Sequence, residues 1–101
     1  MTTFDTAVTV TGHLHSTFEF ESEQAADNWI STEFVKLSKL YPGLTYSKSQ
    51  LPSLKIGDQC YVVGEGSDVF TILGVKNYSP NRYGFILDAG WCEEVYKCYQ
   101  I

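Results

Sequence analysis

Lys55-Ile56-Gly57-Asp58-Gln59-Cys60-Tyr61-Val62-Val63 begins the part of the chain that decides the fold. Residues 69–75, 83–88 and 90–95 follow it, and each of these stretches is short and rich in β-branched or aromatic side chains. Glycine, asparagine, aspartate, serine or proline separates them, which is typical of consecutive antiparallel strands. The C-terminal half therefore predicts a small antiparallel sheet.

The layout of these strands resembles the small, curved β-barrel of the Src-homology type. In that family an apolar-x-apolar-Gly-Asp opening leads into a strand, as at residues 54–58, and an Asp-x-Gly-Trp turn precedes a short closing segment, as at residues 88–91. The resemblance covers about half of the chain and implies a five-stranded barrel. The Ala-Leu-Tyr-Asp-Tyr opening of the peptide-binding members is absent, and no second tryptophan follows Trp91. The resemblance therefore implies topology without groove residues, and the barrel hosts too many functions to imply an activity.

Residues 4–20 alternate between apolar and polar side chains. Threonine, histidine, aspartate and glutamate fill most odd positions, and the even positions hold Phe4, Val8, Val10, Leu14, Phe18 and Phe20. This period of two predicts strands with one buried face and an odd-numbered face that meets solvent. A three-residue loop around Thr11-Gly12-His13 would keep the apolar residues on one face and place Val10 opposite Leu14.

A helix is predicted from the N-cap Ser22 to about Leu40, and Tyr41-Pro42-Gly43 ends it. Ile30-Ser31-Thr32-Glu33 is poor helix sequence and indicates a bend. Apolar residues recur at helical spacing and form one face, made of Ala26, Trp29, Ile30, Phe34, Leu37 and Tyr41.

Residues 44–52 are rich in serine, lysine and glutamine, and we interpret them as a linker with a short extended piece at 44–46. The linker divides the chain into a ββα half, residues 1–48, and a barrel half, residues 53–101. The strand at 69–75 is apolar on both faces, so a second layer has to cover the face outside the barrel. We expect the helix to be that layer, which would make the chain one cooperative domain. The predicted fold class is α+β, mainly β, with an N-terminal β-hairpin and one helix packed on a small Src-homology-like antiparallel β-barrel.

The 101 residues carry seven basic and twelve acidic side chains, for a net charge of −5. The bases are scattered, whereas nucleic-acid binding depends on a clustered basic footprint. The composition thus argues against nucleic acid and anionic membranes as partners. The evenly spread acidity suits a basic protein partner, but its simplest interpretation is that it keeps a small protein soluble. The sequence shows neither an apolar run approaching the ~18 residues of a membrane span nor a signal-peptide pattern. We expect a cytoplasmic protein.

Candidate catalytic residues are few. Cys60, Cys92 and Cys98 form an odd set without a Cys-x-x-Cys spacing, which predicts reduced thiols, with Cys60 in the core. A Cys-His nucleophile pair assembled by the fold stays open as an alternative. His13 and His15 would bind zinc or iron only with a third ligand, so the pattern favours a solvent-facing strand over a metal site. The sequence contains no motif for a cofactor, and the glycine-rich residues 64–68 lack the lysine of a phosphate loop.

The candidate protein-binding residues are Tyr78, Arg82 and Tyr83, which flank a Pro-Asn turn. Tyrosine and arginine are enriched among interface hot spots, and the proline limits their conformational freedom. The structural alternative is that Tyr78 and Tyr83 pair across a hairpin. At the strand-to-helix junction, further acids would steer a basic partner or simply form a soluble edge and a favourable helix N-terminus; these are Glu19, Glu21 and Glu23.

The sequence therefore predicts a small, acidic, non-enzymatic protein that binds another protein and modulates or inhibits it. Phage-encoded inhibitors of host machinery and immunity proteins resemble it in size and composition. The first alternative is an accessory domain that binds a small ligand or nucleic acid, the latter through Lys55, Lys76, Arg82 and Lys97. The second alternative is a metal or thiol enzyme built on His13, His15 and Cys60.

Overall fold

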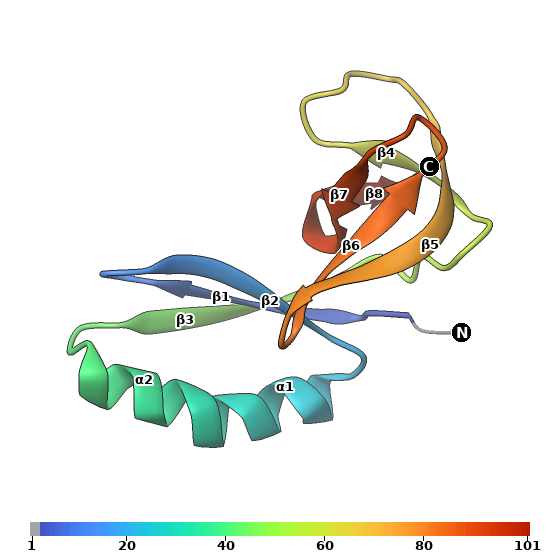
Figure 1. Ribbon diagram of the computed structural model, residues 1–101. Coiled ribbons are helices and arrows are strands. Elements are labelled where there is room, and N and C mark those ends of the chain that lie inside the picture. The colour runs from blue at the N-terminus through green and yellow to red at the C-terminus, as the bar shows by residue number, and fades with distance from the viewer. Residues whose placement is uncertain (1–2) are drawn as a thin grey trace.

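The computed structural model describes residues 3–101. They form two antiparallel sheets, one long helix and a short 3-10 helix at Val95–Lys97, in an elongated arrangement of 41 × 26 × 20 Å (Figure 1). The α+β, mainly β fold class is confirmed. The N-terminal sheet has the order β2-β1-β3, with β1 at Thr6–Thr11, β2 at His15–Phe20 and β3 at Thr45–Gln50. The C-terminal sheet has the order β7-β6-β5-β4-β8, with β4 at Gln59–Val62, β5 at Phe70–Ser79, β6 at Arg82–Leu87, β7 at Cys92–Glu94 and β8 at Cys98–Gln100.

A three-residue loop joins β1 and β2, as the alternation predicts, but it begins one residue later than expected. Thr11 pairs with His15 and Val10 pairs with Ser16, so the expected pairing of Val10 with Leu14 is wrong. Gly12 opens the loop at φ 139°, and a Cβ there would lie 2.8 Å from Leu44 Cδ2. Because the loop length stays odd, the even-numbered residues still share one buried face.

The helix runs without a break from α1 (Glu23–Trp29) through a π-helical segment (Ile30–Phe34) to α2 (Val35–Leu40). The Ser22 side chain accepts a 3.1 Å hydrogen bond from Ala25 N, which confirms the predicted cap. The π-helical segment begins at Ile30, where the sequence indicates a bend. Within it the Thr32 hydroxyl donates to the Asn28 carbonyl at 2.8 Å, in competition with the helix backbone.

The helix covers the N-terminal sheet, so the expectation that it covers the C-terminal sheet is wrong. Trp29 lies 4.7 Å from Phe18 and 5.8 Å from Phe20, measured between ring centroids. These aromatic side chains on β2 give the helix a closer apolar face than the second sheet does. The buried residues of this layer are Val8, Val10, Phe20, Ala26 and Leu44. The outer side chain of Leu73 on β5 stays 57% exposed.

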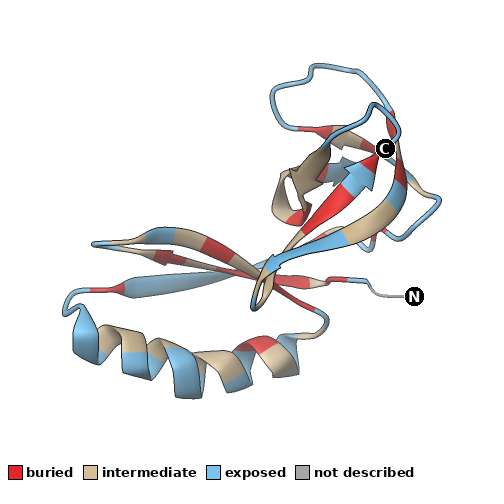
Figure 2. Ribbon diagram, in the orientation of Figure 1, coloured by how far each residue is buried: buried red, intermediate tan, exposed pale blue. Residues whose placement is uncertain are grey.

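Strand β3 occupies the segment that we interpreted as a linker, so that interpretation is wrong. It pairs with β1 over its whole length, from Thr11 opposite Thr45 to Thr6 opposite Gln50. All six of its residues are exposed, and the strand therefore has no hydrophobic alternation by which a sequence could reveal it (Figure 2). It carries the N-terminal sheet to Gln50, beyond residue 48.

The C-terminal sheet has β7 and β8 as its two edges, and within residues 3–101 no pairing between these edges closes a barrel. The glycine-rich residues 64–68 lie in the connection between β4 and β5. Leu54 is buried but Ile56 is 40% exposed, because the chain turns at Gly57, with φ 95°, before β4 begins. The core of this sheet contains Phe4, Ala7, Leu51, Leu54, Cys60, Val62, Phe70, Ile72, Phe85, Leu87, Val95 and Cys98.

The first three members of that core come from the N-terminal unit, by which we mean the N-terminal sheet, its helix and the residues directly beside them. Phe4 lies just before β1, Ala7 lies on its odd face, and Leu51 follows β3. The Phe4 ring is 4.6 Å from the ring of Tyr83 on β6. The two sheets thus share apolar contacts where the β5–β6 hairpin meets β1 and β2.

Candidate functional site

The candidate site is the tip of the β5–β6 hairpin, where sequence and structure place tyrosine and arginine side chains together. Ser79 pairs with Arg82, leaving Pro80 and Asn81 as the turn. Asn81 has φ 60°, and a proline followed by a residue with positive φ is the usual sequence of a type II turn. The Pro-Asn turn therefore sets the register in which Ser79 and Arg82 pair, and with it the face of the hairpin on which each flanking side chain lies.

Strand alternation separates the predicted residues into two groups. Tyr83 points toward the N-terminal unit, where its ring packs against Phe4 and the shared core. Arg82 and Tyr78 line the other side of the hairpin, in a hollow of about 360 Å³ that is completed by Cys92, Glu93 and Glu94. Asn77, not Tyr78, is the cross-strand partner of Tyr83, so the structural alternative, in which the two tyrosines pair across the hairpin, is wrong.

Tyr78 lies over a glycine on the neighbouring strand. A Cβ on Gly84 would come within 2.6 Å of Tyr78 Cε2 and 3.0 Å of the Glu93 carbonyl oxygen. Lys76 Nζ is 5.6 Å from the centroid of the same ring. Burial, followed by the nearby Cys92 and Glu94, raises the pKa of Tyr78. A glycine inside a strand often marks such a close approach, and this signal was present in the sequence.

Arg82 is held only loosely. Its Nη2 lies 4.0 Å from Glu94 Oε2, and the two side chains are 39% and 30% exposed. A contact of this length between partly exposed groups contributes little to stability. The guanidinium therefore keeps donors for an incoming acceptor.

We expected Glu19 to lie on a face that meets solvent, and this expectation is wrong. Glu19 is 2% exposed and lies buried where the hairpin meets β2. Its backbone N–H donates to the Asn81 carbonyl at 2.8 Å, and its Oε1 accepts from Tyr83 N at 2.7 Å. Oε2 is buried and has no hydrogen-bond partner among the described residues. Burial raises the pKa of Glu19 to about 7, with a smaller contribution from Glu94, against the hydrogen bond from Tyr83 and the charge of Arg82. Glu19 therefore fixes the hairpin to β2 and cannot serve as a surface steering charge.

The other two predicted acids are exposed. Glu21 lies at the end of β2, and Glu23 begins α1. Glu23 Oε2 accepts from Lys48 Nζ at 3.1 Å, and Asp27 Oδ1 accepts from the same ammonium at 2.7 Å. These hydrogen bonds, with that of Asp27 the stronger, raise the pKa of Lys48. Glu23 is therefore partly neutralised, whereas Glu21 is exposed and forms no ion pair within residues 3–101.

The histidines lie apart from any further ligand. His13 is in the β1–β2 loop, His15 is on β2, and both are exposed. Across residues 3–101, three or more histidine, cysteine, aspartate or glutamate side chains gather nowhere in an arrangement that could hold a metal ion.

The cysteine side chains are mostly buried. Cys60 and Cys98 lie in the core, and Cys92 is half-buried. Burial raises the pKa of both core thiols, that of Cys98 to about 12. Neutral thiols are poor nucleophiles, so this environment does not suit Cys60 for catalysis.

The four bases of the nucleic-acid alternative have separate local partners. Lys55 Nζ is 3.3 Å from Asp58 Oδ1, and Lys97 Nζ lies 5.7 Å from the centre of the Tyr96 ring. Lys76 and Arg82 contact Tyr78 and Glu94, as described above.

The side chains that complete the hollow on the β5–β6 hairpin could not be predicted from the sequence, because only the β6–β7 pairing brings them there. They are Cys92, Glu93 and Glu94.

Comparison with known proteins gives no relative: the chain matches no family model, no curated protein and no solved structure. None of the helices within residues 3–101 has the length and apolar character needed to cross a membrane.

Proposed function

We propose that this protein binds another protein and modulates or inhibits its activity, without a catalytic site of its own. The observation that carries the proposal is the hollow on the β5–β6 hairpin, which Tyr78 and Arg82 both line. Tyrosine and arginine contribute disproportionately to protein interfaces. The turn and the close contact with Gly84 hold Tyr78 in place before binding, which lowers the entropy cost of association.

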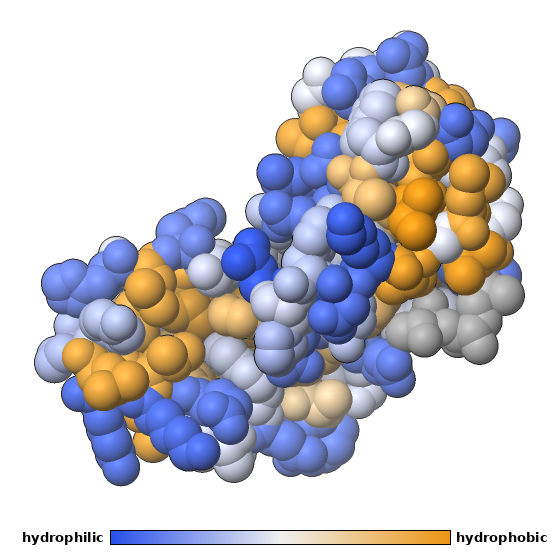
Figure 3. Space-filling view, in the orientation of Figure 1, coloured by the Kyte–Doolittle hydropathy of each residue, from blue (hydrophilic) through white to orange (hydrophobic). Residues whose placement is uncertain are grey.

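Exposed apolar side chains on the same sheet support this surface. Leu73 on β5 is 57% exposed and Ile86 on β6 is 38% exposed. Figure 3 shows apolar residues gathered over the C-terminal sheet and over the N-terminal sheet with its helix, with a hydrophilic region between the two areas where the hairpin ends. Apolar area rimmed by polar groups is typical of protein-binding surfaces. The net charge of −5 favours a basic partner.

The test is capture of partners by the full chain from a lysate of the organism that encodes it, followed by affinity measurement. We expect Tyr78→Ala and Arg82→Ala each to weaken binding of the captured partner by about tenfold or more. Tyr41→Ala is the matched control, since Tyr41 is 40% exposed and lies on the other unit, at the end of the helix. Retention of affinity within about threefold in both hairpin variants would exclude this hollow as the binding centre.

A second candidate function is binding of a small apolar ligand. Tyr61 and Tyr99 lie opposite each other on β4 and β8 and border a hollow of about 590 Å³ together with Val63. Ligand pockets commonly have this size and an aromatic lining. Titration with an aromatic fluorophore, compared between wild type and Tyr99→Ala, distinguishes this function because the hairpin variants should not affect it.

A further inference from the structure

Strand β3 is the least covered element of the molecule. The helix packs mainly over β1 and β2 and touches β3 through Phe34, whose ring lies 4.9 Å from that of Tyr46. Every residue of β3 is nevertheless exposed, although the strand is fully paired with β1. The opposite edge of the sheet, β2, already donates from Glu19 N to the hairpin carbonyl of Asn81. The outer edge of β3 has no such neighbour within residues 3–101.

The register identifies which backbone groups of β3 face outward. Leu51 N donates to the Asp5 carbonyl, so residues 45, 47 and 49 form the hydrogen-bonded pairs with β1. The N–H and C=O groups of Tyr46, Lys48 and Gln50 therefore point away from the sheet. Three evenly spaced residues with free donors and acceptors are what an added strand requires.

The devices that usually protect an edge strand are weak in β3. The strand contains neither proline nor a β-bulge, and its pairing with β1 is uninterrupted. Its single charged side chain, Lys48, is drawn toward the helix, where its ammonium contacts Asp27 at 2.7 Å and Glu23 at 3.1 Å.

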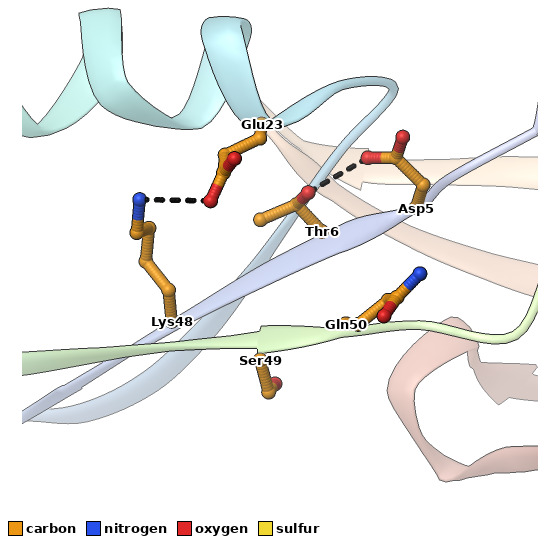
Figure 4. Close-up of a pocket in the computed structure, with 6 residues that line it drawn as sticks. All are labelled: Asp5, Thr6, Glu23, Lys48, Ser49 and Gln50. Atoms are coloured by element: carbon orange, nitrogen blue, oxygen red, sulfur yellow. Dashed lines mark hydrogen bonds and ion pairs between the residues drawn. The ribbon is translucent and has the colours of Figure 1, made fainter.

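Charge identifies the kind of strand that would fit. A hollow of about 460 Å³ lies beside the C-terminal end of β3, and Figure 4 shows Asp5 and Glu23 at its wall with Lys48 and Gln50. Lys48 is matched by two carboxylates, and among the described residues Asp5 has no ion pair, since its Oδ1 accepts from the Thr6 hydroxyl at 2.7 Å. The surroundings are thus net acidic. A second copy of this chain would bring together two molecules of charge −5, which disfavours pairing of β3 with itself.

We propose that β3 accepts an extended, basic segment of a partner protein as a fourth strand of the N-terminal sheet. The backbone of the segment pairs with Tyr46, Lys48 and Gln50, and one of its lysine or arginine side chains reaches the hollow beside Asp5 and Glu23. The inference rests on the proposed protein-binding function, and it assigns a surface separate from the Tyr78 hollow.

The probe is an acetylated and amidated peptide of four Arg-Thr repeats, and its acidic counterpart has four Glu-Thr repeats. Gln50→Pro removes one outward N–H and leaves the pairs with β1 in place, because proline is tolerated where an edge N–H faces solvent. Gln50→Ala is the matched control, since it removes the same side chain and keeps the N–H. Thermal melts establish that both variants fold.

We expect the basic peptide to slow hydrogen exchange at the amides of Tyr46, Lys48 and Gln50 in the full chain. Its affinity for Gln50→Pro should be about tenfold lower than for Gln50→Ala, and the acidic peptide should not bind. Unchanged exchange at these three amides at millimolar peptide, or equal affinity of the two variants, would overturn the proposal. The exchange pattern of the wild type decides alone if Gln50→Pro does not fold.

The outcomes separate this inference from the proposed function. A captured partner that tolerates Gln50→Pro and loses affinity in Tyr78→Ala leaves the proposed function standing and overturns the role of β3. A partner that tolerates both hairpin variants and is lost in Gln50→Pro moves the interface to β3.

Discussion

The backbone N–H of Tyr83 donates a 2.7 Å hydrogen bond to Glu19 Oε1, joining two strands whose residues lie 64 positions apart. With the bond from Glu19 N to the Asn81 carbonyl, it ties the β5–β6 hairpin to the N-terminal sheet. A carboxyl group buried at this junction makes the attachment sensitive to pH.

The first prediction concerns that sensitivity. Because the pKa of Glu19 rises from 4.5 to about 7 on folding, the folded state holds a proton that the unfolded chain releases in this window. The contribution of Glu19 to stability is therefore fully present below about pH 4.5 and is lost as pH rises through 7. Glu19→Gln keeps an acceptor for Tyr83 N and cannot ionise. As pH rises from 4.5 to 7, we expect the free energy of unfolding of the wild type to fall relative to that of Glu19→Gln by up to about 3 kcal/mol. Urea unfolding of both proteins across this range measures it, and a difference that does not vary with pH would contradict the role of Glu19.

The second prediction concerns the contact between Gly84 and Tyr78. A Cβ at Gly84 would lie 2.6 Å from the Tyr78 ring, so Gly84→Ala has to displace the ring from its position in the hollow. We expect a loss of about 1–3 kcal/mol in the free energy of unfolding. In a Tyr78→Ala background the same substitution should cost clearly less, although the Glu93 carbonyl remains close. Equal costs in the two backgrounds would show that the ring does not require the glycine.

The third prediction is that the two sheets unfold together. Trp29 reports on the N-terminal unit and Trp91, 5.1 Å from Phe70, reports on the C-terminal sheet. Trp91→Phe leaves Trp29 as the only tryptophan, and Trp29→Phe leaves Trp91. In each variant, the urea transition followed by fluorescence should have the same midpoint as the transition followed by circular dichroism. Phe4→Ala should destabilise both by about 3–5 kcal/mol because Phe4 joins the two units. Separate transitions would show that the units are independent.

The fourth prediction concerns thiol chemistry. Cys60 and Cys98 are buried thiols with raised pKa values, whereas Cys92 is half-buried on β7. Under native conditions an aromatic disulfide reagent should modify Cys92 first, and the two core thiols only as the protein unfolds. Cys92→Ala is the control, which should remove the fast phase. Rapid native modification of Cys60 would revive the thiol-enzyme alternative.

The parts of the fold that the sequence predicts are those where burial leaves a pattern. The even-numbered apolar residues of β1 and β2, the helix from its Ser22 cap, and the strands around Phe70 and Phe85 follow from periodicity. Strand β3 could not be predicted in this way, since it buries no side chain and is held by pairing with β1.

The candidate site could be predicted only in part, because some of its contacts join residues that are distant in the sequence. Tyr78 and Arg82 were identified by residue type, but the burial of Glu19 depends on a hairpin distant in sequence. One local signal was available: Ala7, the apolar residue among polar odd positions, lies directly opposite Glu19. An apolar residue there indicates that the odd face is covered at this point of the sheet.

The core of the C-terminal sheet contains residues from both ends of the described chain, with Phe4 before β1 and Cys98 on β8. During synthesis β1 emerges first, yet Phe4 and Ala7 cannot reach all of their final neighbours until β8, which carries Cys98, has been made. We therefore expect the N-terminal sheet to form early around its helix, with Phe4 still exposed, and to acquire its final packing only after β8 has been synthesised. Phe4 and Ala7 are thus among the first described residues to be synthesised and among the last to reach their final packing.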